Sequence, residues 1–437
     1  MRTENDVKTM RRICLSLLML AAVLTGATGQ PARTNINPAT LYYQAFLAAP
    51  DLAQADRSFL FENDWRGQKL PERFGELVAQ YDAQFKLVRR AAQATVPCDW
   101  GLDSSEGPAT RLPHLARAKA VGQAARLRLL WNLQQGHQQE ACDDLLAAFV
   151  LGRNLAQDGM LISTLVQISI EAIILNGVAE NFGRFCPEVL ERLSKGFDAA
   201  PAHHTVAACI QAEKAYFQDW LLNRIQELRK AHPGEDAKVM ESIREDFLNV
   251  EKPDQRETSF WERINKAAGG TSEGLIQVLH GREQMYERLS PLLALAYAEY
   301  QARRDQLVAE VEKSPNPLIA STVGFWKARA KEFSIQAYLA MVRAAVEFKL
   351  HGEAGFKSVS DPCGQGPFVF RRFVFGGVDR GFELKSSYDM DGDKCVLIFV
   401  EKDGPLFYVS GPHVGEALPR RSSTEEFQQR YGVAPAK

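Results

Sequence analysis

Residues 113–182 decide the fold, and they read PHLARAKAVGQAARLRLLWNLQQGHQQEACDDLLAAFVLGRNLAQDGMLISTLVQISIEAIILNGVAENF. Apolar and small residues recur at helical spacing from Leu115 to Leu133, and Gly136 ends that pattern. A second pattern of the same period runs from Ala141 to Leu155. Because small residues lie along both stripes, the two helices can approach each other closely. The spacing therefore predicts a hairpin of two packed α-helices.

The next segment, residues 160–179, is apolar almost all round, which is typical of a buried central helix. A membrane-spanning helix is the alternative. Ser163, Thr164, Gln167 and further polar side chains argue against it, because lipid offers them no hydrogen-bond partners. We therefore expect a third, buried helix in a protein core.

Glu171 is the only charged residue in that segment. A buried carboxylate costs free energy unless it is paired, and its pKa rises when it is not. The functional interpretation is a general acid or base in an internal pocket. The structural interpretation is an ion pair with Arg117, Arg126 or Arg128 of a neighbouring helix. We favour the ion pair, because one carboxylate without a second group is not a mechanism.

The sequence pattern changes near residue 355, where long helical stripes give way to short β-prone runs. Asp391–Gly392 and Asp403–Gly404 are hairpin signals between these runs. We predict a mainly α fold, with an irregular, solenoid-like body of helical hairpins and a small C-terminal antiparallel β module. The expected units are a signal peptide (1–29), a helical-hairpin body (30–231), an irregular charged insertion or linker (232–271), long helices (272–354), the β module (355–421) and a polar tail (422–437).

The N-terminus has the pattern of a secretory signal peptide: Arg11 and Arg12 precede the apolar run 13–24, and small residues follow it. That run is shorter than the roughly 20 apolar residues that span a bilayer. We expect cleavage near Gly29, export to the periplasm or the extracellular space, and no stable membrane insertion afterwards. The formal net charge of −2 gives no attraction to nucleic acid, so no nucleic-acid partner is expected.

Of the seven cysteines, only Cys14 lies in the expected signal peptide, and the even remainder allows disulfides in an exported protein. Cys186 and Cys209 lie almost equally far from one turn, so an antiparallel helical hairpin would place them opposite each other. Cys363 and Cys395 lie in the same predicted β module. Both pairs are candidate disulfides, and buried free thiols are the alternative.

Residues 98–103 (CDWGLD), 107–108 (GP) and 112–115 (LPHL) resemble a segment of uncharacterised exported helical proteins from planctomycete-type bacteria. Those families bring no activity and no catalytic residue. The turn between Gly136 and Ala141 resembles that of a tetratricopeptide (TPR) hairpin, and one such copy is seen where an array needs at least three. The resemblance implies a TPR-like helical scaffold.

Residues 361–370 (DPCGQGPFVF) and 381–386 (GFELKS) are similar to the C-terminal end of type II secretion pseudopilins, where two such strands follow a long helix. This chain departs from that family at its other end. No prepilin-type processing motif follows the basic N-terminus, and the helix before the module is not N-terminal. The resemblance implies a reused β module and no role in pilus assembly.

Asp99 and His114 form a second candidate site, since an acidic group, a histidine and the nearby Trp100 suit hydrolytic chemistry or sugar binding. The structural alternative places Asp99 in a side-chain turn and Trp100 in a gap of the core. His203–His204 is a weaker hint of a metal site. Adjacent residues on a helix point about 100° apart, so we interpret this pair as a helix start.

Asp389, Asp391 and Asp393 suggest a calcium loop in the β module. An EF-hand needs Gly at its sixth position and Glu at its twelfth, where this chain has Lys394 and Val400. A looser calcium or glycan site is the functional hypothesis, and a solvated hairpin turn is the default.

No serine-hydrolase elbow, zinc-protease helix, phosphate-binding loop or dinucleotide fingerprint occurs in the sequence. The leading hypothesis is therefore a non-enzymatic scaffold or binding protein of the cell envelope, with a protein or peptide partner and no cofactor. The alternatives are a hydrolase that uses Glu171 or the Asp99/His114 region, and calcium or glycan binding by the β module. The hydrolase hypothesis requires a deep polar pocket in which at least two titratable groups converge.

Overall fold

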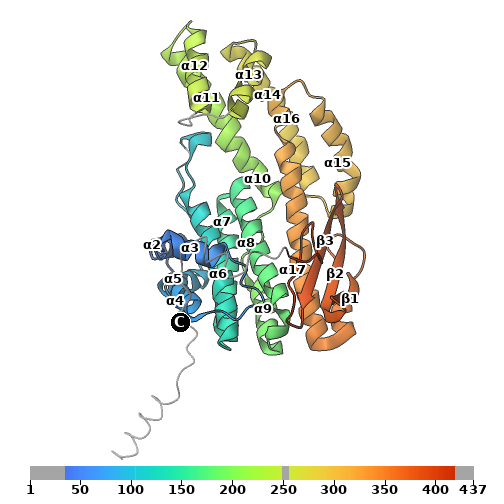
Figure 1. Ribbon diagram of the computed structural model, residues 1–437. Helices are drawn as coiled ribbons and strands as arrows, with labels where there is room; N and C mark the ends of the chain where they lie inside the picture. Colours follow the sequence, from blue (N-terminus) through green and yellow to red (C-terminus); the bar gives the residue numbers. More distant parts are fainter. Residues whose placement is uncertain (1–34, 104, 249–254, 419–437) are drawn as a thin grey trace, which may run out of the picture.

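A computed structural model describes residues 35–103, 105–248 and 255–418 (Figure 1). Within that part of the chain the fold is mainly α, with a small antiparallel sheet at the C-terminal end, which confirms the predicted fold class. The predicted signal peptide and polar tail lie outside the described residues.

The first half of the described chain contains helices and no strand. Its elements are α2 (Pro38–Leu47), α3 (Gln54–Phe61), α4 (Glu72–Ala79), α5 (Asp82–Ala92), η1 (Gly107–Ala109), α6 (Pro113–Gln134), α7 (Gln138–Leu155), η2 (Ala156–Asp158), α8 (Leu161–Glu180), η3 (Phe182–Arg184) and α9 (Pro187–Ala199).

Helices α6 and α7 form the predicted hairpin, and α8 packs against both of them. Gly136 turns the chain between α6 and α7 with φ at 78°, a left-handed conformation that favours glycine. The side chain of Ile170 on α8 lies against Gly122 of α6 and Gly152 of α7, where an added Cβ would approach it to 3.4 and 3.3 Å. The small residues therefore allow α8 to pack closely on α6 and α7, in addition to the packing of α6 on α7.

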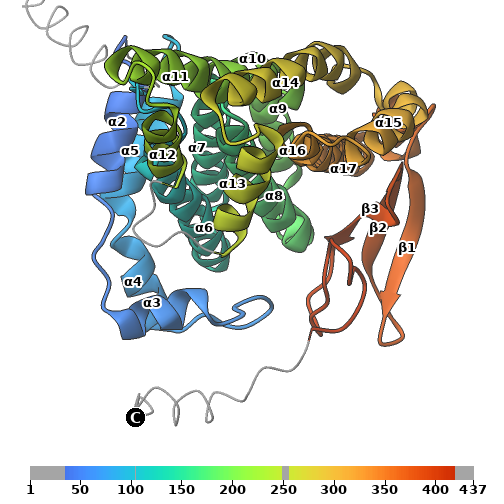
Figure 2. The same cartoon turned by 90° about the horizontal axis from the view of Figure 1, so that it is seen from above.

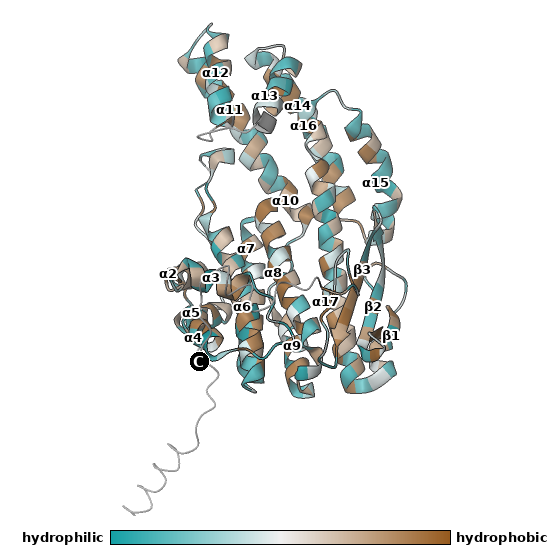
Figure 3. Ribbon diagram, in the orientation of Figure 1, coloured by the Kyte–Doolittle hydropathy of each residue, from teal (hydrophilic) through white to brown (hydrophobic). Residues whose placement is uncertain are grey.

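Layers of helices surround this central group (Figures 1 and 2). The N-terminal helices α2 to α5 cover one side of α6 and α7, and α17 lies along the other side of α8. Figure 2 shows the sheet beyond α17, at the opposite edge of the molecule from α2. Hydrophobic residues stand out on α6, α8 and β3, whereas the outer faces of α12 and α15 are mostly hydrophilic (Figure 3).

The middle of the chain leaves the body as an arm, which comprises the described residues 220–248 and 255–279 and projects from one end of the molecule (Figure 1). It follows α10 (Val206–Glu213) and the π-helical turn η4 (Lys214–Asp219), and its helices are α11 (Trp220–Ala231), α12 (Asp236–Phe247), α13 (Gln255–Ala267) and the start of α14 (Ser272–Leu293). The arm has a small apolar core separate from that of the body, and Leu318 from a later helix also contributes to it.

The arm is more regular than the sequence indicates, because two helices lie where an irregular charged insertion is predicted. Among the described side chains, Val239, Met240 and Ile243 on α12 are buried apolar residues, and so are Trp261 and Ile264 on α13. Each helix buries so few apolar residues among so many charges that its period is hard to recognise from sequence. Their burial against α11 and α14 nevertheless holds both helices in place.

The last elements are α15 (Tyr297–Glu312), α16 (Pro317–Ala320), the long helix α17 (Val323–Ser358), and strands β1 (Val369–Phe375), β2 (Val378–Met390) and β3 (Asp393–Val400). The strands pair antiparallel in the order β1-β2-β3, with Phe370 opposite Leu384 and Leu384 opposite Leu397. Asp391 and Gly392 have positive φ in the predicted hairpin turn. The β-prone run at 406–409 forms only isolated bridges, among them Phe407 with Ala417.

The sheet docks on the helical body and shares its core. Phe182, just after α8, packs edge-on against Phe382 and Phe399, with ring centroids 5.8 and 5.2 Å apart. Gly183 lies so close to the backbone of Glu401 that an added Cβ would be 2.3 Å from its carbonyl oxygen. The β module therefore packs against the helical body through the turn that follows α8.

Helix α8 is the one helix among the described residues that is long and apolar enough to cross a membrane by length and composition. Here it packs against α6, α7 and α17, and 56% of its most apolar window is buried.

Neither expected disulfide forms, and the six cysteines of the described chain are free thiols. Cys186 precedes α9, where its N–H donates to Gln138, whereas α10 turns away to pack on α8 and α14. The helical hairpin that would place Cys209 opposite Cys186 is therefore absent. In the β module, Cys363 lies in the loop before β1 and Cys395 beneath Ser334 of α17, without a bond between them.

Candidate functional site

Glu171 lies in the middle of α8 with 1% of its side chain exposed, and it pairs with an arginine. Arg153, in the last turn of α7, has its Nε 2.6 Å from Glu171 Oε1. The structural interpretation of Glu171 thus holds, but all three arginines predicted as its partner are wrong. Two of the α6 arginines pair with other carboxylates: Arg126 with Glu180, and Arg128 with Asp144 and Asp82. The third, Arg117, is exposed.

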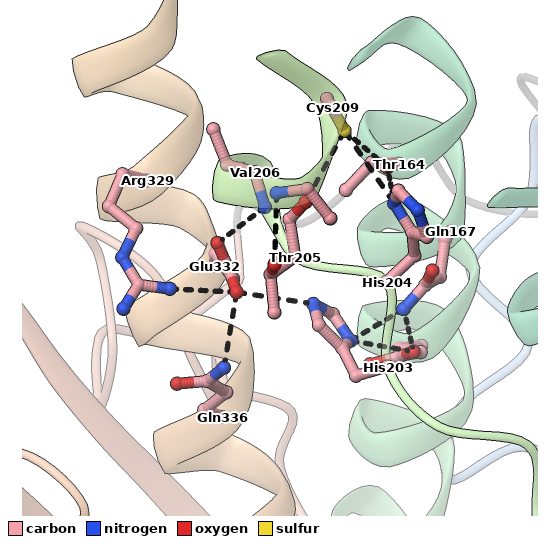
Figure 4. Close-up of polar contacts among 12 residues, drawn as sticks. Thr164, Gln167, His203, His204, Thr205, Val206, Cys209, Arg329, Glu332 and Gln336 are labelled. Carbon is pink, nitrogen blue, oxygen red and sulfur yellow. Dashed lines mark hydrogen bonds and ion pairs between the residues drawn. The ribbon is translucent and has the colours of Figure 1, made fainter. Parts of the chain in front are cut away.

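A histidine from an extended segment reaches the same carboxylate. Residues 200–205 connect α9 to α10 without regular structure, and there His203 places Nδ1 3.4 Å from Glu171 Oε1. Gln167, one turn before Glu171 on α8, donates to that oxygen at 2.8 Å and also contacts His203 (Figure 4). Glu171 therefore has partners from three segments of the chain.

Glu332 on α17 approaches His203 from the other side, with Oε1 3.9 Å from Nε2 (Figure 4). This second carboxylate is fully buried, and Arg329 lies 2.7 Å from it. Glu332 also accepts the N–H of Val206 at 2.9 Å, the first residue of α10. The result is one imidazole between two buried carboxylates, each of which has its own arginine.

These contacts determine the ionisation states of Glu171 and Arg153. Burial opposes ionisation of Glu171, but the hydrogen bond from His203 and the charge of Arg153 outweigh it, so the pKa of Glu171 is lowered. Burial lowers the pKa of Arg153 although Glu171 raises it, and the guanidinium remains charged near neutral pH. Glu171 is thus a carboxylate in an ion pair, which excludes it as a general acid at neutral pH.

His204, the next residue, contacts a different set of partners from His203. Its Nδ1 lies 3.4 Å from Thr164 Oγ1 and 3.6 Å from Cys209 Sγ (Figure 4). Burial raises the pKa of the Cys209 thiol to about 12 and lowers the pKa of His204. The thiol is therefore protonated at neutral pH and is not an activated nucleophile.

A cavity of about 480 Å³ lies beside Glu171 and His203. It is bounded by α7, α8, the end of α9, the extended segment, α17 and the loop that follows α17. Its polar wall consists of Arg153, Glu171, Asp198, His203, Gln336, Arg343 and Ser360, and its apolar wall includes Phe197, Leu339, Ala340 and Val359. Two or more titratable groups thus line one pocket, which is one part of what the hydrolase hypothesis requires.

The second candidate site does not assemble. His114 is buried and stacks on Trp100 with ring centroids 4.7 Å apart, and within the described chain neither of its ring nitrogens has a partner. Burial lowers the pKa of His114 to about 4, so the imidazole is neutral. Asp99 is exposed and accepts the N–H of Gly101 in a side-chain turn. Trp100 fills the core and donates to the carbonyl of Asn154, in line with the structural alternative.

The aspartates of the β module face basic side chains of the same chain. Asp391, in the β2–β3 turn, pairs with Arg304 of α15 at 2.8 Å, and Asp389 pairs with Lys394 at 3.0 Å. Asp393 begins β3 and is exposed. In the described residues no three His, Cys, Asp or Glu side chains are grouped so that they could hold a metal ion.

The chain matches no protein-family profile, no curated protein and no solved structure. The resemblances to planctomycete-type proteins and to pseudopilins therefore stay predictions. Sequence reasoning identified Glu171 and missed Arg153 and His203 as its partners. It also missed Glu332 on the other side of His203 and Arg343 on the cavity wall. The interpretation of His203–His204 as a helix start is wrong, because both residues precede α10, which begins at Val206.

Proposed function

We propose that this protein is a binding protein that holds a small polar molecule in the cavity beside Glu171 and His203. The observation that carries the proposal is the cavity itself, about 480 Å³, with charged side chains from α7, α8, α9 and α17 and the imidazole of His203 on its wall. Ligand pockets commonly have volumes of roughly 300–1,000 Å³ and combine an apolar lining with a few placed polar groups.

A gain in stability does not by itself explain why these ion pairs are buried here. Buried ion pairs are often no more stabilising than apolar residues of the same volume. Two such pairs, Glu171 with Arg153 and Glu332 with Arg329, lie on either side of His203. Charged groups that are buried next to a pocket are typical of sites that recognise a polar ligand.

The sequence analysis also predicted a binding protein, but with a protein or peptide as its partner. Here we propose a small molecule as the ligand instead. Export and a location in the cell envelope remain predictions, since the signal-peptide pattern lies outside the described residues.

A hydrolase is the second candidate, because His203 and Glu171 meet beside the cavity. Three observations make it the weaker one. Glu171 is held by Arg153, His203 Nε2 is buried without a hydrogen-bond partner, and the Cys209 thiol is protonated at neutral pH. No described nucleophile adjoins the histidine in the way that covalent hydrolysis needs.

A thermal-shift panel tests the proposal. Organic acids, phosphate esters, amines, neutral sugars and dipeptides are each titrated into the purified protein, and the melting temperature is followed. A ligand at 100 times its Kd stabilises the folded state by about 2.7 kcal/mol, which raises the melting temperature by several degrees. At least one class is expected to do so saturably.

Variants that fill the cavity locate the response. A340W places an indole in the cavity from α17, and S360W blocks its exposed rim. Both are expected to abolish the shift, whereas A302W, on the exposed face of α15, keeps it. A panel without any stabilising compound, or an equal response in A340W and S360W, would contradict the proposal.

A further inference from the structure

We infer that the ligand of this cavity carries an anionic group, a carboxylate or a phosphate, on a compact apolar body, and that Arg343 and Arg153 bind the anion. The inference rests on the proposed function and names the chemical class of the ligand.

Arg343 on α17 has donors to spare. Within the described chain its guanidinium contacts only Asp198, and its Nε is buried without a hydrogen-bond partner. The Asp198 side chain is 59% exposed, so water screens this pair and weakens it. An anion in the cavity would therefore meet a half-buried guanidinium whose present partner competes poorly.

Arg153 is the second cation on this wall, and it is fixed in place. Glu171 holds its Nε, the carbonyl of Pro201 accepts from Nη1 at 3.3 Å, and its guanidinium lies over the ring of Phe149 at 4.9 Å. Because these partners come from different elements, the orientation of Arg153 is set before a ligand arrives. A preorganised guanidinium loses little entropy when it binds a carboxylate or phosphate.

The two arginines also repel each other. Burial lowers the pKa of Arg153, and the neighbouring charge of Arg343 lowers it further, against the opposing effect of Glu171. An anion between the two guanidiniums would relieve this repulsion. Glu171 compensates the charge of Arg153 through its Nε, whereas within the described chain the guanidinium of Arg343 has only the exposed Asp198 as an ion-pair partner.

The remaining wall indicates the body of the ligand. Phe197, Leu339, Ala340 and Val359 line the same cavity as the charged groups. Phe197 and Leu339 are buried, so they exclude water from that side. A short aliphatic chain or a single ring would contact these residues while its anionic group meets the arginines.

Matched probes test the inference by calorimetric titration of the full chain. Benzoate and phenyl phosphate carry the two anionic groups on one ring, benzamide is the neutral counterpart, and benzylamine is the cationic one. We expect saturable binding of at least one anion, and the preferred anion decides between carboxylate and phosphate. Benzamide and benzylamine are expected to bind at least tenfold more weakly.

Substitution of the arginine assigns the site. R343Q should weaken binding of the anion at least tenfold, R343K should restore part of it, and R303Q, at an exposed arginine of α15, should leave it unchanged. The fold should survive R343Q because the one partner that is lost, Asp198, is exposed. Unchanged binding in a folded R343Q variant would overturn the inference.

The probes also separate this inference from the proposed function. If benzamide or benzylamine binds as tightly as the anions and A340W abolishes that binding, the cavity binds ligands but not through an anion. If neither these probes nor any compound of the thermal-shift panel binds, both proposals fail.

Discussion

Arg153 Nε and Glu171 Oε1 lie 2.6 Å apart at the wall of the cavity and join α7 to α8 through a buried ion pair. Neither group has full access to water, so each depends on the other for compensation of its charge. The pair fixes the wall of the proposed binding site and the packing of the two central helices at the same time.

Removal of one partner is expected to be severe. E171A leaves the Arg153 charge buried without compensation, and we predict a loss of about 3–5 kcal/mol in the free energy of unfolding. The double variant R153M/E171L should regain most of that loss, because it removes both charges and fills the space. Urea unfolding of the single variants R153M and E171L and of the double variant gives the coupling energy, and additive effects would contradict a direct pair.

Acid should weaken the protein through Glu171. The pKa of this carboxyl is lowered in the folded state from its ordinary value of 4.5, so the unfolded chain takes up the proton first as the pH falls. The stability that ionised Glu171 contributes is therefore complete above about pH 4.5 and is lost as the pH falls through the lower, folded-state pKa. The measurement is the free energy of unfolding between pH 6 and 3. E171Q should show a shallower decline than the wild type, and parallel curves would count against the ionised pair.

His114 should make the stability of the protein depend on pH at higher pH values than Glu171 does. Its pKa is about 4 in the folded state and 6.5 ordinarily, so the unfolded chain binds the proton between these values. Stability is therefore complete above pH 6.5 and falls as the pH drops toward 4, by on the order of 1–3 kcal/mol. H114F keeps an aromatic ring against Trp100 and cannot titrate. Its melting temperature relative to the wild type should rise between pH 7.5 and 5, and a constant difference would show that the imidazole is not buried in neutral form.

Gly183 should control the docking of the β module. In G183A the new Cβ would lie 2.3 Å from the carbonyl oxygen of Glu401, so the backbone of one element must shift. We predict a loss of about 1–3 kcal/mol in the free energy of unfolding. G324A is the matched control, because Gly324 lies in α17 with nothing within 4 Å of an added Cβ. It should be neutral or stabilising by up to about 1 kcal/mol, and equal effects of the two changes would refute the close approach.

The central helices were predictable from sequence because their periodicity is strong. The Gly136 turn, the apolar α8 and the Asp391–Gly392 turn all follow from local rules that act within a few residues. Helices α12 and α13 were not predictable in the same way. Their apolar stripes are short, and both helices are stabilised by burial against α11 and α14. A local sequence pattern does not show which distant segments will pack together.

The site shows the same division. Glu171 stood out because a single charge in an apolar helix needs a partner. His203 lies 32 residues from it along the chain, and Glu332 comes from a helix that is further still. Nothing local in the sequence encodes such distances. Arg153 was overlooked because helical periodicity gives the face of a residue but not which neighbouring helix that face meets.

The most direct measurement is a crystal structure of the protein with the tightest-binding anion from the titration series. The account predicts electron density for the anionic group within hydrogen-bond distance of the Arg343 guanidinium, with its apolar body against Leu339 and Phe197. Density for the ligand at another surface, while the cavity beside Glu171 holds only water, would contradict it.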